Sequence, residues 1–428
     1  MTSMQHKFGA LDLIRAGLQD LDRARTLFDE LHNDGIDGDR MRLLLATLEK
    51  ACDPDIALSN LVDIIKVMQS QGKDFTNIIA DENSFVRLIT VLGVSDEMGK
   101  LMRFRPELVE AAANDACESH LYNHEQRRAH VLKSVGADPN DHTMPTASLP
   151  LAEAATALRK TYRKQLAAIM AQDATANDPI EIQPRISTEL SDLADAALEG
   201  ALAIARHEVD GSEHVRFAII GMGKLGAQEL NYVSDVDLIY VVEPADMDTN
   251  GMALSRIGTK MATTLQRVCQ SVIMGVAEPT LWQIDGGLRP EGKDGPLVRR
   301  LESHEAYYEQ WAENWEFQAL LKARPVAGDT DLGQAYMDMT RPFVWTASKR
   351  DNFVYDCQQM RKRVEDLIPN PLKDREIKLG RGGLRDVEFT VQMLQLVHGR
   401  SDEALRTSST LESLQALAEG ARAGGLNF

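Results

Sequence analysis

The stretch from Phe217 to Glu243, FAIIGMGKLGAQELNYVSDVDLIYVVE, decides the fold, because it sets two apolar runs on either side of a glycine-rich turn. The turn G-M-G-K-L-G fits the G-x-G-x-x-G pattern of dinucleotide sites, and Glu243 lies where a ribose-binding carboxylate would follow. Such sites also need an amphipathic crossover helix after the glycines. The segment AQELNYVSD is too short for that helix and ends in turn-forming Ser-Asp. The sequence therefore argues against a dinucleotide fold.

Two carboxylates stand at the entrance to the second apolar run. Asp235 and Asp237 are one residue apart, so in an extended chain both side chains point to the same face, roughly 6.6 Å apart. Mg²⁺ takes oxygen ligands from one or two carboxylates and completes its shell with water and phosphate. The pair beside a glycine turn is typical of a phosphoryl or nucleotidyl transfer site. The alternative is a solvated strand start.

A third carboxylate and several cations are further candidates for the same transfer site. Asp285 ends the apolar run TLWQID, and Arg289 and Lys293 come soon after it. In the glycine turn, Lys224 offers a point charge to phosphate oxygens. Backbone N–H groups can approach phosphate closely where glycines stand; those glycines are Gly221, Gly223 and Gly226. A plain strand-to-helix turn is the alternative reading of this loop.

Apolar periodicity predicts an α+β chain that is mostly helical. Residues 1–210 read as successive amphipathic helices, with a Pro-rich break at 136–150. Convincing β-branched runs, VRFAII, VDLIYVV and TLWQID, occur only after position 211. We therefore expect a helical N-terminal region (1–210), a catalytic core with a small mixed sheet (211–335) and a helical C-terminal domain (336–428).

Charge and composition narrow the classes of partner. The formal charge of −18 over 428 residues argues against broad binding to nucleic acid or an anionic membrane, since both surfaces would repel the chain. The four cysteines are far apart, without C-x-x-C spacing, which favours a reducing compartment. The N-terminus lacks the pattern of a secretion signal. We expect a cytoplasmic protein with protein or small-molecule partners.

Four motifs in order carry a family resemblance: GMGKLGAQELNYVSDVDLIYV, LRPEGKDGPLVR, WEFQALLKARPVAGD and KLGRGGLRDVEFTVQMLQLVHGR. Together they resemble the catalytic signature of the glutamine synthetase adenylyltransferase/adenylyl-removing enzymes. In the first 200 residues the resemblance is weaker. The resemblance of the four motifs implies a polymerase-β-like nucleotidyltransferase fold. In the full protein this fold is present twice, and this chain holds one copy. One departure is Gly286-Gly287, where other members often carry a basic residue before LRP.

The resemblance also implies a reaction. In that family the first copy removes AMP from a tyrosine of glutamine synthetase by phosphorolysis, releasing ADP, and the second attaches AMP from ATP. The long helical region ahead of the motifs and the arginine in GGLRDVEF look more like the first copy. Implied partners are adenylylated glutamine synthetase, a PII-type signalling protein and the second catalytic half.

Roles for individual residues follow from the resemblance. Asp235 and Asp237 are expected to hold Mg²⁺. Asp285 is expected to hold a second metal ion or to position the nucleophile. Expected phosphate ligands are Lys224, Arg289 and Lys293, with Lys322 and Arg324 as further candidates that could equally be structural ion pairs. Ser234 either caps the turn or binds nucleotide. Asp386 and Glu388 open a helix, where the helix dipole alone favours them, although a line to the active site is possible.

Four hypotheses remain open at this point. The first is removal of AMP from a protein tyrosine, and the second is ATP-dependent adenylylation by the same fold. The third is a non-catalytic module that binds glutamine synthetase or a signalling protein, which the intact carboxylates disfavour. The fourth, a dinucleotide oxidoreductase, suffers from the missing crossover helix.

Overall fold

The structure, a computed structural model, describes residues 8–73, 75–113, 122–246, 250–373 and 375–422. It divides into two compact units, one formed by Met1–Arg127 with Lys160–Glu189 and the other by Arg128–Arg159 with Leu190–Phe428. The three-domain division expected from the sequence does not coincide with these units and stays a prediction. The fold class is confirmed: the chain is mostly helical and carries one small mixed sheet.

Short amphipathic helices build most of the first unit. They are α1 (Ala10–Arg15), α2 (Leu21–Asn33), α3 (Gly38–Leu48), α4 (Pro54–Ser70), α5 (Thr76–Ala80), α6 (Glu82–Val94), α7 (Asp96–Phe104) and α8 (Pro106–Ala113). Aspartates begin several of them; Asp53, for example, accepts a hydrogen bond from the Ile56 N–H at 3.0 Å, with Pro54 at the first helical position. Buried leucines such as Leu44, Leu61 and Leu92 form a continuous core.

Three helices follow in the chain: α9 (His124–Ser134), α10 (Leu151–Ala174) and α11 (Pro179–Glu208). The segments 128–159 and 190–208 belong to the second unit. There Arg159 is almost fully buried and donates to the carbonyls of Val268 and Ser271. It thereby satisfies orphan carbonyls at the end of a helix beside the sheet.

The second unit holds the sheet and its covering helices. Its strands are β1 (Val215–Met222), β2 (Val236–Pro244), β3 (Ile284–Asp285), β4 (Val298–Arg299) and β5 (Arg324–Gly328). Its helices are α12 (Gly223–Gly226), α13 (Gly251–Gln270), α14 (Leu301–Gln310), α15 (Asn314–Leu320), α16 (Thr330–Thr346), α17 (Phe353–Asp366), α18 (Leu384–His398) and α19 (Thr410–Arg422).

The strand order is β3-β2-β1-β5, with β4 also paired to β2. β1 is antiparallel to β2 and β5, whereas β3 and β4 run parallel to β2. A dinucleotide fold would need β1 and β2 to be parallel and joined by a long helix. The antiparallel pairing and the four-residue α12 exclude that fold.

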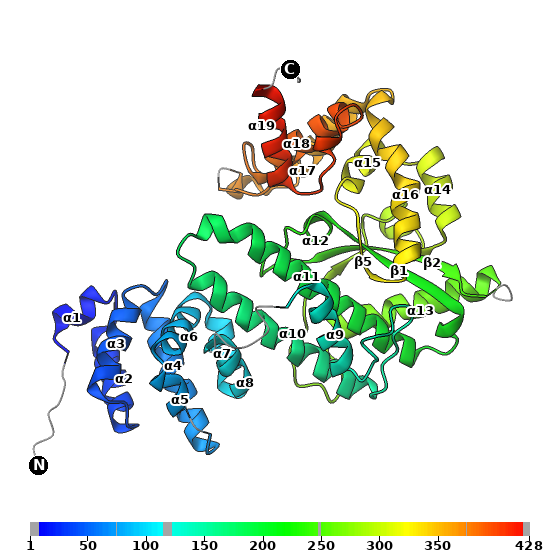
Figure 1. The fold of residues 1–428 in the computed structure, drawn as a ribbon. Helices are drawn as coiled ribbons and strands as arrows, with labels where there is room; N and C mark the ends of the chain where they lie inside the picture. The colour runs from blue at the N-terminus through cyan, green and yellow to red at the C-terminus, as the bar shows by residue number, and fades with distance from the viewer. Residues whose placement is uncertain (1–7, 74, 114–121, 247–249, 374, 423–428) are drawn as a thin grey trace, which may run out of the picture. The chain divides into compact units, whose positions relative to one another are not determined.

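Side-chain alternation gives the central strands two buried faces. In Figure 1, α14 and α16 lie on one side of the sheet and α13 on the other. Ile220 and Ile239 pack with Tyr308 and Tyr336 from α14 and α16. On the opposite face Tyr240 accepts a hydrogen bond from Gln266 of α13. Two covered faces explain why these strands read as continuous apolar runs.

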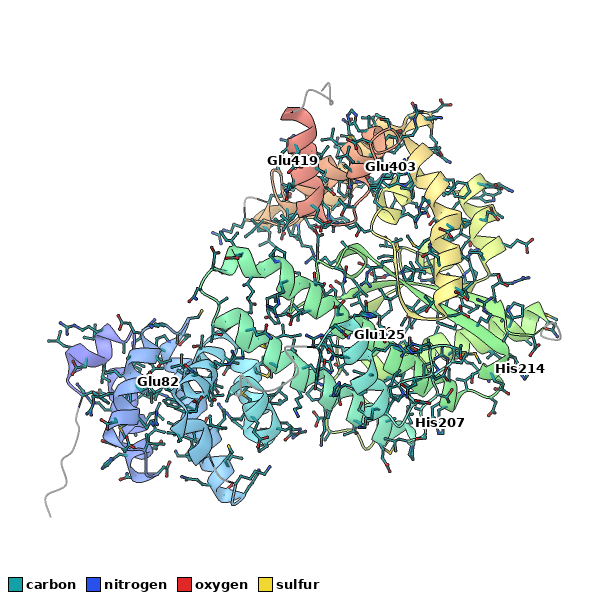
Figure 2. The ribbon with its side chains drawn as sticks, viewed as in Figure 1. Glu82, Glu125, His207, His214, Glu403 and Glu419 are labelled. Carbon is teal, nitrogen blue, oxygen red and sulfur yellow. The ribbon has the colours of Figure 1, made fainter. Side chains whose placement is uncertain are left out.

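Charged side chains stand on the outer surfaces of the helices, among them Glu82, Glu403 and Glu419 (Figure 2). Among the described residues, no helix combines the length and the apolar character that a membrane crossing requires.

Candidate active site

The glycine turn lies at the edge where β1 ends and β2 begins. Met222, the last residue of β1, is the register partner of Asp237. Gly223 follows with φ of 55°, and a Cβ atom at this position would lie 2.6 Å from Oδ2 of Asp237. At Gly226 a Cβ atom would lie 1.7 Å from the carbonyl oxygen of Lys322. These two glycines let the turn lie against the Asp237 carboxylate and β5, a role that needs no dinucleotide.

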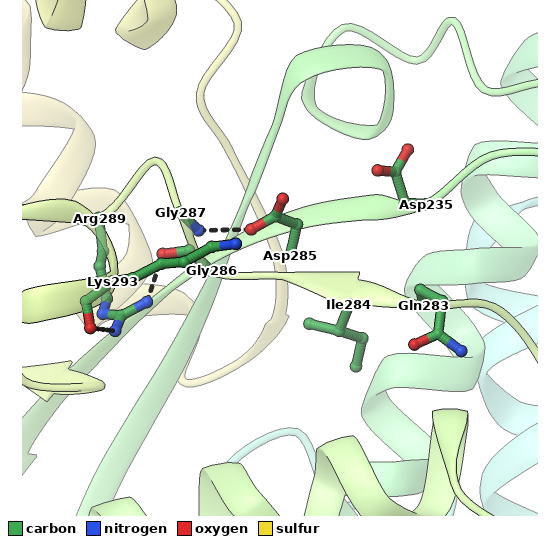
Figure 3. Close-up of a pocket in the computed structure, with 8 residues that line it drawn as sticks. All are labelled: Asp235, Gln283, Ile284, Asp285, Gly286, Gly287, Arg289 and Lys293. Atoms are coloured by element: carbon green, nitrogen blue, oxygen red, sulfur yellow. Dashed lines mark hydrogen bonds between the residues drawn. The ribbon is translucent and has the colours of Figure 1, made fainter.

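Three aspartates converge beside this turn. Asp237 and Asp285 are register partners on the parallel strands β2 and β3, and Asp235 immediately precedes β2. Asp235 and Asp285 line a pocket of about 300 Å³. Figure 3 shows both carboxylates on the same side of the strands. The N–H of Gly287 donates to Oδ1 of Asp285 at 2.7 Å and fixes that side chain.

The concentration of negative charge perturbs Asp237. Burial, together with the neighbouring charges of Asp235 and Asp285, raises the pKa of Asp237 to about 6. Carboxylates crowded in this way repel one another, and a bound cation relieves the repulsion. The donor set consists of hard oxygen atoms, which Mg²⁺ prefers. The residues therefore fit a divalent cation held by Asp235, Asp237 and Asp285.

Arg289 turns out to hold its own loop. Its guanidinium donates to the carbonyl oxygens of Gly286 at 2.6 Å, Lys293 at 3.1 Å and Gly295 at 3.1 Å. These bonds close the loop after β3 and shape one wall of the pocket. The exposed Lys293 side chain extends in the direction of Asp285 (Figure 3), where it can meet an anion.

Lys322 and Arg324 are engaged in internal ion pairs. The Lys322 amino group is buried and contacts Glu229 at 3.0 Å and Glu388 at 2.9 Å. Arg324, in β5, binds Asp195 at 2.6 Å and donates to the carbonyl of Leu225. Of the two readings the sequence allowed, these contacts favour the structural one.

The remaining predicted residues lie around the turn. Burial, and then the charge of Lys378, lowers the pKa of Lys224, whose amino group is 3.3 Å from Oδ1 of Asn231. Ser234 donates to the carbonyl of its neighbour Asp235 at 2.8 Å, so it shapes the turn. Gly221 is buried in β1, where a Cβ atom would lie 2.6 Å from Val326.

Glu243, placed by the sequence where a ribose ligand would lie, instead binds Arg300 at 3.0 Å and accepts the N–H of Leu301. Asp386 is bound to Arg361, and Glu388 to Lys322 and Arg385. Lys378, which sequence reasoning did not single out, and Arg385, which it used only to choose between the two copies, both act to lower the pKa of Asp237 against the effect of burial. They stand in the fourth motif, KLGRGGLRDVEF, which was the available signal.

Comparison with known proteins identifies the family and several relatives. The family described as glutamate-ammonia ligase adenylyltransferase matches residues 85–339, and a PII-uridylyltransferase family matches residues 358–423. A bifunctional glutamine synthetase adenylyltransferase/adenylyl-removing enzyme from Bifidobacterium longum (strain DJO10A) is 75% identical over 420 residues, covering 98% of this chain and 39% of the relative. Proteins with the same description from Cutibacterium acnes and Streptomyces avermitilis are 44% and 41% identical; the alignments cover 96% of this chain in both cases and 41% and 39% of those relatives. The chain thus spans about two fifths of the length of these relatives.

Proposed function

Since the chain belongs to the glutamate-ammonia ligase adenylyltransferase family, we propose that it removes the adenylyl group from a tyrosine of glutamine synthetase by phosphorolysis. The observation that carries the proposal is the convergence of Asp235, Asp237 and Asp285 beside a glycine turn. A non-catalytic binding module would have no use for three carboxylates that repel one another.

Inorganic phosphate suits this site as the nucleophile. One of its oxygens forms a bond to the α-phosphorus, while the bond from that phosphorus to the tyrosine oxygen breaks. The bonding pair stays on the tyrosine oxygen, and the proton of hydrogen phosphate ends there. The products are ADP and tyrosine. No general base from the protein is required, and the residues that line the described pocket include no histidine.

The chain's own residues have positioning roles in this reaction. Asp235, Asp237 and Asp285 would hold Mg²⁺, which when bound neutralises phosphate charge and acts as a Lewis acid. Lys293 is exposed on the pocket loop, where it can contact a phosphate. Arg289 keeps that loop closed through backbone carbonyls. Catalysis of this kind depends on alignment and charge neutralisation.

The direction of the reaction rests on the resemblance to the adenylyl-removing copy, and one experiment separates the two directions. The chain is incubated with Mg²⁺ and either adenylylated glutamine synthetase plus phosphate, or unmodified glutamine synthetase plus ATP. We expect ADP in the first reaction and no transfer of AMP in the second. The opposite result would assign ATP-dependent adenylylation to this site. No reaction in either arm would favour a non-catalytic module.

A further inference from the structure

The segment Ile377–Gly383, which leads into α18, carries several cations. Lys378 and Arg381 are exposed in this segment, and Arg385 follows in the first turn of α18. The pocket described above is lined by other residues. Lys378 and Arg385 differ from Arg381 in their surroundings.

The segment is built rigidly from its own hydrogen bonds. Arg361 of α17 binds Oδ1 of Asp386 and donates to the carbonyls of Leu379 and Gly380, both at 3.0 Å. Asp386 in turn accepts the N–H of Gly382 at 2.6 Å. The N–H of Arg385 donates to the carbonyl of Lys378 at 2.9 Å. Lys378 and Arg385 therefore project from one fixed backbone pair.

A continuous chain of contacts ties Arg385 to the glycine turn. Arg385 binds Glu388 at 3.1 Å, and the other oxygen of Glu388 accepts from Lys322 at 2.9 Å. Lys322 also binds Glu229, whose N–H donates to the carbonyl of Lys224 at 2.8 Å. The guanidinium thus has a defined position relative to the turn that lies against Asp237.

Electrostatics agree with that position. After burial, the charges of Lys378 and Arg385 both contribute to the lowered pKa of Lys224 in the glycine turn. Arg381 is not among the largest influences on the pKa of Lys224. Its side chain is 90% exposed and pairs only loosely with Glu365, at 3.9 Å.

We infer that Lys378 and Arg385 bind the phosphate groups of the adenylyl nucleotide beside the glycine turn. Arg289, Lys322 and Arg324 are occupied by protein partners, so a nucleotide anion needs other cations. A guanidinium has five N–H donors, and the contact with Glu388 leaves Arg385 donors for a phosphate. Glu388 and Lys322 are positioning residues for Arg385. The identity of the ligand rests on the proposed function.

The test measures the affinity of the full chain for ADP with Mg²⁺ by isothermal titration calorimetry. Lys378→Gln and Arg385→Gln should each weaken binding by about tenfold or more, because each removes a charge-assisted contact. The matched control is Arg381→Gln, which removes a cation from the same segment and should stay within about twofold of wild type. Arg385→Lys should fall between wild type and Arg385→Gln. Equal loss in all three glutamine variants, or no loss in any, overturns the inference.

Folding and reaction are followed in parallel. Lys378 is exposed, so Lys378→Gln should keep the wild-type melting temperature even if Arg385→Gln does not. If the wild-type chain releases no ADP from adenylylated glutamine synthetase yet the affinities change as expected, the proposed function fails and this inference stands. If ADP is released while the affinities of both variants match wild type, the proposed function stands and this inference fails.

Discussion

At Asp237, the proposed metal binding and the stability of the metal-free protein would oppose each other. Its pKa is raised to about 6, so the ionised form is disfavoured in the folded state relative to the unfolded chain. Folded stability therefore falls as the pH rises from about 4 to about 6 and stays lower above that range. A bound cation would offset this penalty, as expected if Asp237 is a metal ligand.

Asp237→Asn should lower the rate of AMP removal by about 100-fold or more. At pH 7 the free energy of unfolding of the metal-free variant should be unchanged or higher than wild type by up to about 1–3 kcal/mol. The gain should vanish near pH 4, where the wild-type carboxyl is protonated. Thermal unfolding at both pH values measures this. Asp294→Asn, an exposed acid of the pocket loop, is the matched control and should change neither quantity. An unfolded variant or near-normal activity would contradict the metal assignment.

Gly223 is constrained by both conformation and space. Gly223→Ala puts a side chain at φ of 55° and directs its Cβ atom to 2.6 Å from Oδ2 of Asp237. We expect about 1–2 kcal/mol of destabilisation and a loss of activity of about tenfold or more. Gly72→Ala has a φ of 66° with nothing within 4 Å of the added atom, so it isolates the conformational cost. Equal activity in the two variants would show that the approach to Asp237 is unimportant.

Among the elements, β5, α18 and α19 are held to the glycine turn by one buried lysine. Lys322 lies just before β5 and binds Glu229, Glu388 of α18 and the hydroxyl of Thr410 at the start of α19. Burial alone would raise the pKa of Glu388, but the charge and hydrogen bond of Lys322 hold that pKa below its ordinary value. A buried cation that serves two carboxylates is costly to remove.

Lys322→Met should destabilise the second unit by about 2–4 kcal/mol, because it leaves Glu229 and Glu388 without their shared cation. The exchange rates of backbone amide hydrogens should increase more in α18 and α19 than in the rest of the second unit. Lys260→Met, at an exposed position of α13, should cost less than about 0.5 kcal/mol in chemical unfolding. Unchanged exchange in α18 and α19 would mean that other contacts hold these helices.

The central strands and the three aspartates were predictable, because continuous apolar runs and an Asp-x-Asp pair are local signals. β5 was not, since Pro325 argues against a strand. The proline is tolerated because, within the described residues, β5 is an edge strand that pairs with β1 alone. The expected run TLWQID forms only the two-residue β3. The roles of the cations were harder to predict. Sequence reasoning left Lys322 and Arg324 open between phosphate ligands and structural ion pairs, and it expected Arg289 to bind phosphate. In the structure all three are bound by protein groups, several of them distant in sequence.

At the scale of the whole molecule, the proposed nucleotide site carries cations, whereas the chain as a whole is strongly negative. The chain carries −18, yet Lys293 lines the pocket with Asp235 and Asp285, and the charges of Lys378 and Arg385 act to lower the pKa of Asp237. Raising ionic strength should weaken ADP and phosphate binding, because it screens these cations, but it should spare or assist docking of glutamine synthetase against an acidic surface. Affinities for ADP and for adenylylated glutamine synthetase, measured across a salt series, test this. Equal, steep losses for both ligands would mean that one basic surface serves both.

The identity of the nucleophile tests the account most directly. Adenylylated glutamine synthetase is incubated with the chain, Mg²⁺ and phosphate that carries oxygen-18 at every position, and the released nucleotide is analysed by mass spectrometry. We predict ADP whose β-phosphoryl group and bridging oxygen carry the label, with no product from Asp237→Asn. Release of unlabelled AMP, or release that does not depend on phosphate, would contradict phosphorolysis at this site.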